Sequence, residues 1–213
     1  MTPTVACVVV TYNHERWVRE ALDSILAQDE PCGRVRLAVV DNGSTDATPE
    51  ILREYEDRAT VLPIAAGPVN AAFNLGFEHV DGDYLTVFSG DDVWTAGRLD
   101  HMIGVMEGDP EVGLLYGDME IVDGEGVTRH PSMIRQSRLR LPAGPPLGDL
   151  MKRNLVFGPA LLIRGSLRRA VLPIPPQGAP CRPAPPTPTR HRRGRSPGRR
   201  HRAARPPRGR PRR

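Results

Sequence analysis

The chain has 213 residues, 39% of them apolar, which is enough to build one domain around a real core. Its net charge of +4 conceals two unlike parts, because all 25 acidic residues lie at or before Asp149, whereas residues 172–213 hold 13 arginines, 12 prolines and no acid. Residues 1–171 keep 16 of the 29 basic residues and so carry a net charge of −9. We expect an acidic globular domain and a disordered tail that has too little apolar surface to fold.

The three cysteines, Cys7, Cys32 and Cys181, are unevenly spaced and form no CxxC pair, which argues against a disulfide framework and against a zinc site. A reducing, cytoplasmic location follows most simply. The apolar run Val5–Val10 is too short for a signal-peptide core, and no other run approaches the roughly 20 residues of a membrane-spanning helix. We therefore expect a soluble chain.

Four short apolar runs, rich in β-branched residues, have the pattern of strands that are buried on both faces of a parallel sheet. They lie at Val5–Val10, Val35–Val40, Thr60–Ile64 and Tyr84–Phe88. Apolar residues with the helical period follow each run. Asn13 can cap the first helix, and Thr48 can cap the second, with Pro49 at its first helical position. The third is expected at about residues 69–79, and Leu99, Ile103 and Met106 mark the fourth.

This alternation of strands and helices predicts an α/β fold, with an open, mostly parallel, Rossmann-like sheet flanked by helices and joined by right-handed crossovers. Residues 112–116 and 119–122 are further strand-like runs, and residues 155–163 predict one more strand. We assign residues 1–171 to this domain and residues 172–213 to the disordered tail.

Polar residues follow three of the predicted strands, at the edge where open α/β sheets bind their ligands. They are Thr11-Tyr12-Asn13, Asp41–Asp46 and Gly90-Asp91-Asp92. Each cluster alone is explained by a helix cap or a tight turn. Together they place two acidic groups and an amide at one rim, which caps alone do not require.

The residues at this rim also indicate the kind of ligand. A dinucleotide-binding domain would carry GxGxxG after the first strand and a phosphate-binding loop would carry GxxxxGK[ST], and neither is present. Carboxylates repel a diphosphate unless a divalent cation stands between them. The acidic rim therefore implies Mg²⁺ or Mn²⁺ bound through oxygen.

The segments VVVTYNHERWVREALDSILAQ, VVDNGSTDATPEIL, NAAFNLGFEHVDGDYLTVFSGDDVW and GLLYGDMEIVDGEG resemble successive blocks of family 2 glycosyltransferases. The resemblance covers about residues 5–170. It implies the type A fold and an inverting transfer of a sugar from a nucleotide-diphospho-sugar, often a UDP-sugar, to a hydroxyl of a carbohydrate, lipid-linked or other acceptor, as in cell wall or polysaccharide biosynthesis.

The resemblance also implies roles for single residues. Three of them, Thr11, Tyr12 and Asn13, would border the nucleotide, and Asp41 would accept a hydrogen bond from the base. Asn74, in the NxG block, would help to shape the donor pocket.

The metal site is implied by the block SGDD. Asp91 matches the last acid of the family's DxD motif, which binds the metal, and Asp92 would support it or cap the next helix. Ser89 replaces the first acid of the motif, and its hydroxyl would reach the ribose or a metal-bound water.

The general base is the part of the family pattern that this sequence does not supply. In the family it is an acid that follows the strand matched by residues 155–163, and no acid follows Asp149. The other candidates are weaker: His14, His79 and His101 are expected to be surface or capping residues, and Trp94 is expected to pack beneath the pocket rather than stack on sugar.

Two hypotheses compete for residues 172–213. An arginine-rich tail can bind nucleic acid or anionic membrane, but this one has no aromatic residue, no amphipathic period and no lysine. Because arginine, proline, alanine and glycine have GC-rich codons, a shifted reading frame would produce the same composition, and we favour that hypothesis. The alternatives to an active transferase are a non-catalytic nucleotide-sugar binder and a nucleic-acid adapter.

Overall fold

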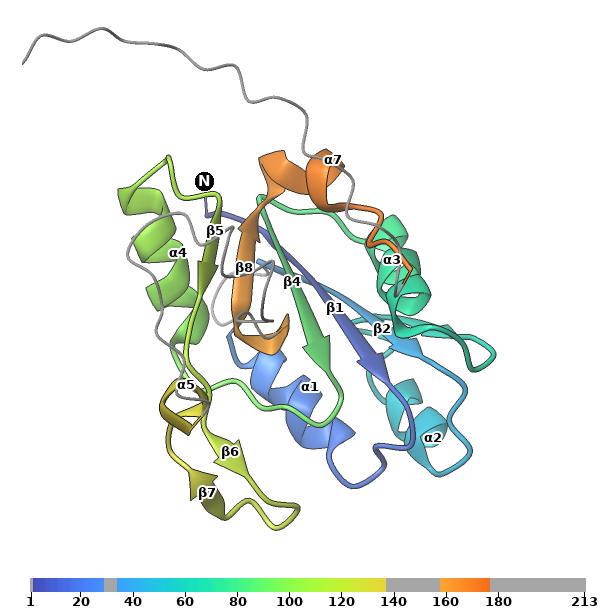
Figure 1. Cartoon of the computed structure of the whole chain (residues 1–213). Helices are drawn as coiled ribbons and strands as arrows, with labels where there is room; N and C mark the ends of the chain where they lie inside the picture. The colour runs from blue at the N-terminus through green and yellow to red at the C-terminus, as the bar shows by residue number, and fades with distance from the viewer. Residues whose placement is uncertain (1, 29–33, 137–157, 177–213) are drawn as a thin grey trace, which may run out of the picture. The chain divides into compact units, whose positions relative to one another are not determined.

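The computed structural model describes residues 2–28, 34–136 and 158–176, all of which belong to one compact unit within Met1–Pro180. Its centre is a six-stranded sheet of order β3-β2-β1-β4-β8-β5 (Figure 1). The strands are β1 (Val5–Thr11), β2 (Val35–Asp41), β3 (Thr60–Pro63), β4 (Tyr84–Ser89), β5 (Leu114–Tyr116) and β8 (Leu161–Arg164). The pairs β1·β2, β1·β4 and β2·β3 are parallel, whereas β8 is antiparallel to both of its neighbours.

The crossovers are helical. They contain α1 (Val18–Leu26), α2 (Thr48–Arg53), α3 (Val69–His79) and α4 (Arg98–Gly108). Outside the main sheet, β6 (Ile121–Val122) and β7 (Thr128–His130) form a separate hairpin, followed by α5 (Met133–Gln136). Two short 3₁₀ helices flank β8, η1 (Gly158–Ala160) and η2 (Gly165–Leu167), and α7 (Arg168–Val171) comes last.

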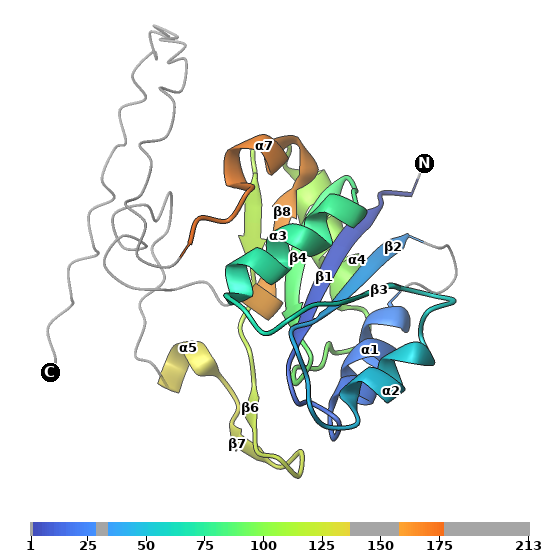
Figure 2. The same ribbon diagram turned by 90° about the vertical axis from the view of Figure 1, so that its right-hand side faces the viewer.

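The sheet has an apolar core on each face because side chains alternate along its strands. On β1, Val5, Cys7 and Val9 belong to the cluster covered by α1, α2 and α4. The residues between them face the other way, into the cluster covered by α3, and Figure 2 shows α3 on the side of the sheet opposite α1 and α2. Gly76 allows α3 to come this close, because a Cβ there would lie 2.2 Å from Val8 Cγ1.

The predicted α/β class and the four alternating strand–helix units are confirmed, with strand ends that differ by one residue at most. Two details of the later chain differ. Residues 119–122 supply β6, which lies outside the main sheet. The predicted strand at 155–163 is described from residue 158 onward, and only Leu161–Arg164 are strand, antiparallel in the sheet.

Three helix caps were predicted wrongly. Helix α2 begins at Thr48 itself and its N-cap is Ala47, so Thr48 is the first helical residue and not the cap. The first helix begins at Val18 rather than directly after Asn13, because residues 15–17 form a turn and the side chain of Asn13 bonds another loop. Helix α4 begins at Arg98 after Gly97, so Asp92 lies too far from it to act as its cap.

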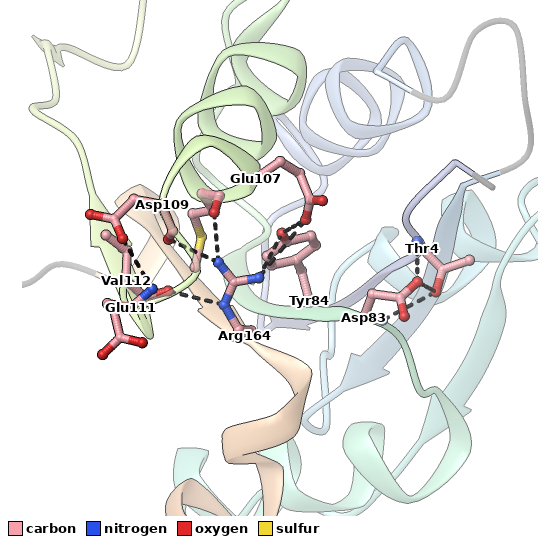
Figure 3. A network of polar contacts seen from close by, with 9 residues as sticks. Thr4, Asp83, Tyr84, Glu107, Asp109, Glu111, Val112 and Arg164 are labelled. Atoms are coloured by element: carbon pink, nitrogen blue, oxygen red, sulfur yellow. Dashed lines mark hydrogen bonds and ion pairs between the residues drawn. The ribbon is translucent and has the colours of Figure 1, made fainter. Parts of the chain in front are cut away.

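The edge of the sheet where β1 and β4 begin is closed by a dense polar network (Figure 3). The guanidinium of Arg164 donates to the carbonyls of Val112 (3.0 Å) and Met106 (2.6 Å) and to the Tyr84 hydroxyl (3.3 Å). The Tyr84 hydroxyl in turn donates to Glu107. This network ties β8 to the end of α4 and to the loop before β5.

The chain beyond α7 follows α3. The side-chain amide of Asn74 pairs with the peptide of Ile174, donating through Nδ2 to its carbonyl (2.9 Å) and accepting its N–H through Oδ1 (2.7 Å). Asn70 donates to the carbonyl of Pro175. Two residues of the segment assigned to the tail, Ile174 and Pro175, are thus bonded to the domain. Residues 177–213 lie outside the described residues, and the boundary at 171 stays a prediction.

Within the described ranges, no helix has both the length and the apolar character needed to cross a membrane.

Candidate functional site

The three polar clusters meet at one edge of the sheet, as predicted. Thr11 at the end of β1 pairs in register with Asp41 at the end of β2, and Val10 pairs with Ser89 at the end of β4. Because the three strands are parallel, their following loops leave the sheet side by side. We call this rim, formed by residues 11–15, 41–48 and 89–92, the acidic edge.

Two loops of the acidic edge are fastened to each other. The Asn13 side chain accepts the Thr45 N–H at 2.7 Å, and the Asn13 N–H donates to Ser44 Oγ at 2.9 Å. The His14 N–H donates to Thr48 Oγ1 at 2.9 Å. These bonds use side chains to satisfy backbone groups that neither strand nor helix can pair, and so fix the shape of both loops.

The backbone conformation of Asn13 makes this arrangement of the two loops possible. Its φ of +54° lies in the left-handed region, which asparagine tolerates better than most residues with a Cβ. The turn at Asn13 points its amide at the second loop instead of along α1. The amide therefore fastens the two loops and does not cap the helix.

Asp41 and Asn42 are nearly withdrawn from solvent at the end of β2. Asp41 Oδ1 accepts the Ser44 N–H at 3.1 Å. Asn42 pairs with the peptide group of Gly67, accepting its N–H at 3.0 Å and donating to its carbonyl at 2.9 Å. The buried carboxylate of Asp41 thus lies at the end of β2, where hydrogen bonds to Ser44 and Gly67 fix the loop that follows.

The two carboxylates after β4 have few partners. Asp91 is half exposed, accepts the hydroxyl of Ser89, and has the nearest basic group, His14 Nε2, at 3.9 Å. Burial, with repulsion from the neighbouring Asp91 carboxylate, raises the pKa of Asp92 to about 6. The acidic edge therefore holds negative charge that no arginine or lysine of the described chain neutralises by an ion pair.

Unpaired polar atoms gather beside these carboxylates. Thr11 Oγ1 and His14 Nδ1 are buried and have no hydrogen-bond partner among the described residues. Gly90 lies next to both atoms, since a Cβ there would be 2.5 Å from Thr11 Oγ1 and 2.8 Å from His14 Nδ1. Buried polar atoms are normally hydrogen-bonded, so these two are suited to partners that a ligand or an ordered water supplies.

These residues fit a divalent cation that is shared with a ligand. In the described parts of the chain, no three His, Cys, Asp or Glu side chains are grouped to hold a metal by themselves. Mg²⁺ commonly takes only one or two carboxylates and completes its shell with waters and substrate phosphates. Asp91 and Asp92, adjacent and without an arginine or lysine partner among the described residues, match that requirement.

The remaining candidates are placed as follows. Tyr12 is half exposed on the acidic edge. Trp94 is buried against Phe88 with ring centroids 5.1 Å apart, which confirms packing over sugar stacking. The amide of Asn74 is paired with Ile174, so its donor-pocket role stays a prediction.

Sequence reasoning placed His14 wrongly. It was expected to be a surface or capping residue, but only 20% of its side chain is exposed, no side chain caps α1, and its imidazole lies 3.9 Å from Asp91 at the acidic edge. The only feature of the sequence that could have indicated this position is the neighbouring Asn13. The turn at Asn13 brings the imidazole of His14 next to Gly90, directly after β4.

An open parallel sheet with acidic loops at its carboxyl edge defines the class of α/β domains that bind ligands outside their strand ends. The chain belongs to glycosyl transferase family 2, whose family model matches residues 6–170. It is 27% identical over 168 residues to an uncharacterized glycosyltransferase of Rickettsia felis, covering 76% of this chain and 27% of that protein. It is 32% identical over 128 residues to an uncharacterized protein of Mycobacterium bovis, covering 57% and 37%.

Solved structures share the fold. TarS of S. aureus (residues 1–349) is similar with a TM-score of 0.61 and 23% identity, covering 78% of this chain and 48% of that one. The mannosyltransferase PcManGT of Pyrobaculum calidifontis, solved with GDP-Man and Mn²⁺, has a TM-score of 0.57 and 21% identity, covering 80% and 47%. The chain thus spans less than half the length of each of these relatives and structures.

Proposed function

We propose that this chain binds a nucleotide-diphospho-sugar, a UDP-sugar in the first instance, and takes part in inverting transfer of the sugar to an acceptor hydroxyl. The observation that carries the proposal is the acidic edge, where two carboxylates and two buried polar atoms without partners face the strand ends. Membership of family 2 supports the reaction class. A cytoplasmic location and an acceptor that is a carbohydrate or is lipid-linked belong to the same proposal.

The nucleobase of the donor would be recognised at the end of β2. Oδ1 of Asp41 accepts the Ser44 N–H, and we assign the second oxygen to an imide N–H such as uracil N3–H. A hydrogen bond to a carboxylate is about twice as strong as one between neutral groups. Thr11, Tyr12 and Asn13 border the nucleotide on the β1 side. TarS has been solved with UDP and with UDP-GlcNAc, which supports a uridine donor.

Asp91 would hold Mg²⁺ or Mn²⁺, with Asp92 and the Ser89 hydroxyl supporting it. Such a cation neutralises the charge that develops on a departing nucleoside diphosphate. The Mn²⁺ in the PcManGT structure supports this assignment.

Transfer also needs the acceptor oxygen to lose its proton as it attacks the anomeric carbon. A general base typically contributes about 10²–10⁴ in rate. No residue of the acidic edge is assigned this role, and no acid follows Asp149. We therefore expect the chain to bind the donor and transfer by the chain itself to be slow.

The test is to incubate the purified chain with UDP-sugars and Mn²⁺ while measuring UDP binding and UDP release separately. Binding with slow release of UDP, faster when an acceptor is added, is the expected result. Binding without any release would identify a non-catalytic binder. Absence of UDP binding, combined with salt-sensitive binding of RNA, would replace the proposal with the adapter hypothesis.

A further inference from the structure

A hollow of about 370 Å³ lies between α4 and β5, outside the acidic edge. Its walls include Arg98 and His101 from α4, Leu115 and Tyr116 from β5, and Thr95 from the loop before α4. Because β4 and β5 are both antiparallel to β8, they run in the same direction, and Tyr116 at the end of β5 lies toward the same edge of the sheet as Ser89.

Arg98 is the basic group of this hollow, and it has spare hydrogen-bond donors. Its Nη2 donates to the carbonyl of Pro159 at 2.9 Å, and its guanidinium stacks on Trp94 at 5.6 Å. Its Nε is buried without a partner, and Nη1 has no hydrogen bond to any described residue. Nη1 reaches β5, since it lies 3.7 Å from where a Cβ on Gly117 would be.

Arg98 differs from the other arginines that are withdrawn from solvent in the described chain. Arg34 pairs with Asp100 at 2.7 Å, Arg168 with Asp81 at 3.2 Å, and Arg164 with Glu107 at 3.8 Å. Arg98 has no such carboxylate among the described residues, and burial lowers its pKa. A partly buried cation without a counter-charge is costly, and an anion would offset that cost.

The rest of the hollow favours an anion as well. Among the described residues that line the hollow, none is acidic, although residues 1–171 carry a net charge of −9. His101 lies one turn after Arg98 on the same helix, and Thr95 and Tyr116, which carry hydroxyl groups, line the same space. Met102 and Leu115 give the hollow an apolar side that suits a carbon skeleton.

We propose that this hollow binds an oxyanion, a phosphate or carboxylate, carried by the acceptor. The assignment to the acceptor rests on the proposed function. Along the edge, Asp41 on β2 would bind the nucleobase, and Asp91 after β4 would hold the cation beside the diphosphate. The hollow lies beyond both residues, toward β5. We assign the second reactant to the side of Arg98, because on this assignment the base and the diphosphate occupy the ends of β2 and β4.

The experiment is a calorimetric titration of the full chain, in low salt, with glycerol phosphate and separately with glucuronate. We expect millimolar or tighter binding of at least one, weakened about tenfold or more in Arg98→Gln, because a charge-assisted hydrogen bond is lost. His101→Gln, at an exposed position, should weaken it a few-fold without affecting folding. Arg53→Gln, which removes an exposed guanidinium on α2, is the matched control and should change nothing.

UDP with Mn²⁺ is titrated into every variant, so that failure of the inference and failure of the proposed function are distinguishable. Loss of anion binding in Arg98→Gln with UDP binding kept supports the inference. Equal anion binding in all variants, anion binding that UDP displaces competitively, or no anion binding by the native chain overturns it. If Arg98→Gln does not fold, the His101→Gln titration decides by the same criteria.

Discussion

The polar groups at the two edges of the sheet differ in how completely they are hydrogen-bonded. Where β1 and β4 begin, Arg164 donates hydrogen bonds to three carbonyls, including that of Asp109, and to a hydroxyl (Figure 3). Asp83 accepts both the N–H (2.8 Å) and the hydroxyl (2.9 Å) of Thr4. Where the same strands end, Asp91 and Asp92 lie side by side, and Thr11 Oγ1 is buried without a partner.

This contrast separates stability from ligand binding. A network whose members satisfy one another contributes to the free energy of folding and offers nothing to a ligand. Buried polar groups without hydrogen-bond partners lower the stability of the fold. They are found where a ligand supplies the missing hydrogen bonds. We therefore expect substitutions at the edge of Arg164 to change unfolding alone, and substitutions at the acidic edge to change binding.

Arg164→Ala should have the largest effect of the variants that sharpen this comparison. It leaves several carbonyls without donors and removes the side chain that joins β8 to α4, so the free energy of unfolding should fall by about 2–4 kcal/mol. Chemical denaturation measures it. Arg129→Ala, which removes an ion pair between an exposed guanidinium and Asp123, is the matched control and should change unfolding much less. Equal losses in the two variants would show that the network is not structural.

Asp41→Asn should come next, with UDP affinity lowered about tenfold. The variant keeps an oxygen for the Ser44 N–H but loses the negative charge that strengthens a bond from the imide. Pyrophosphate, which has no base, should bind as before when both ligands are titrated with Mn²⁺. An equal loss for both ligands would reduce Asp41 to a turn residue.

Asp92→Asn should have the smallest effect, and it should depend on pH. Because the pKa of Asp92 is raised to about 6 in the folded protein, its charged form costs stability. That cost is absent below the ordinary value of 3.8, grows as the pH rises through about 6, and is complete above it. Without metal, the asparagine variant should therefore be more stable at pH 7.5, by under about 1 kcal/mol since the carboxyl keeps contact with water, and equally stable near pH 3.5. Thermal melts in chelator across this range provide the check, and a constant difference would show that Asp92 does not titrate abnormally.

The sequence was sufficient to predict the elements that depend on local pattern. The buried runs at β1 and β2 and the polar residues after them place Thr11, Asp41 and Asp91 at one edge, because parallel strands leave no other arrangement. That reasoning needs only periodicity and the rule for crossovers.

What it could not predict depends on contacts between distant residues or on single backbone torsions. The left-handed turn at Asn13 moves the start of α1 and buries His14, and nothing in the helical period signals it. The pairing of Asn74 with Ile174 joins residues that are 100 positions apart. Arg164 satisfies carbonyls at the end of α4 only because β8 enters the sheet antiparallel, which an apolar run does not specify.

Metal-dependent donor binding at Asp91 is the central expectation for the acidic edge. The measurement is the affinity for UDP with Mn²⁺ and with chelator, by calorimetry, in the native chain and in Asp91→Asn. We predict that Mn²⁺ strengthens UDP binding at least about tenfold in the native chain and has little effect in the folded variant, because the carboxylate that holds the cation beside the diphosphate is gone. An equal gain from Mn²⁺ in both proteins would contradict the account.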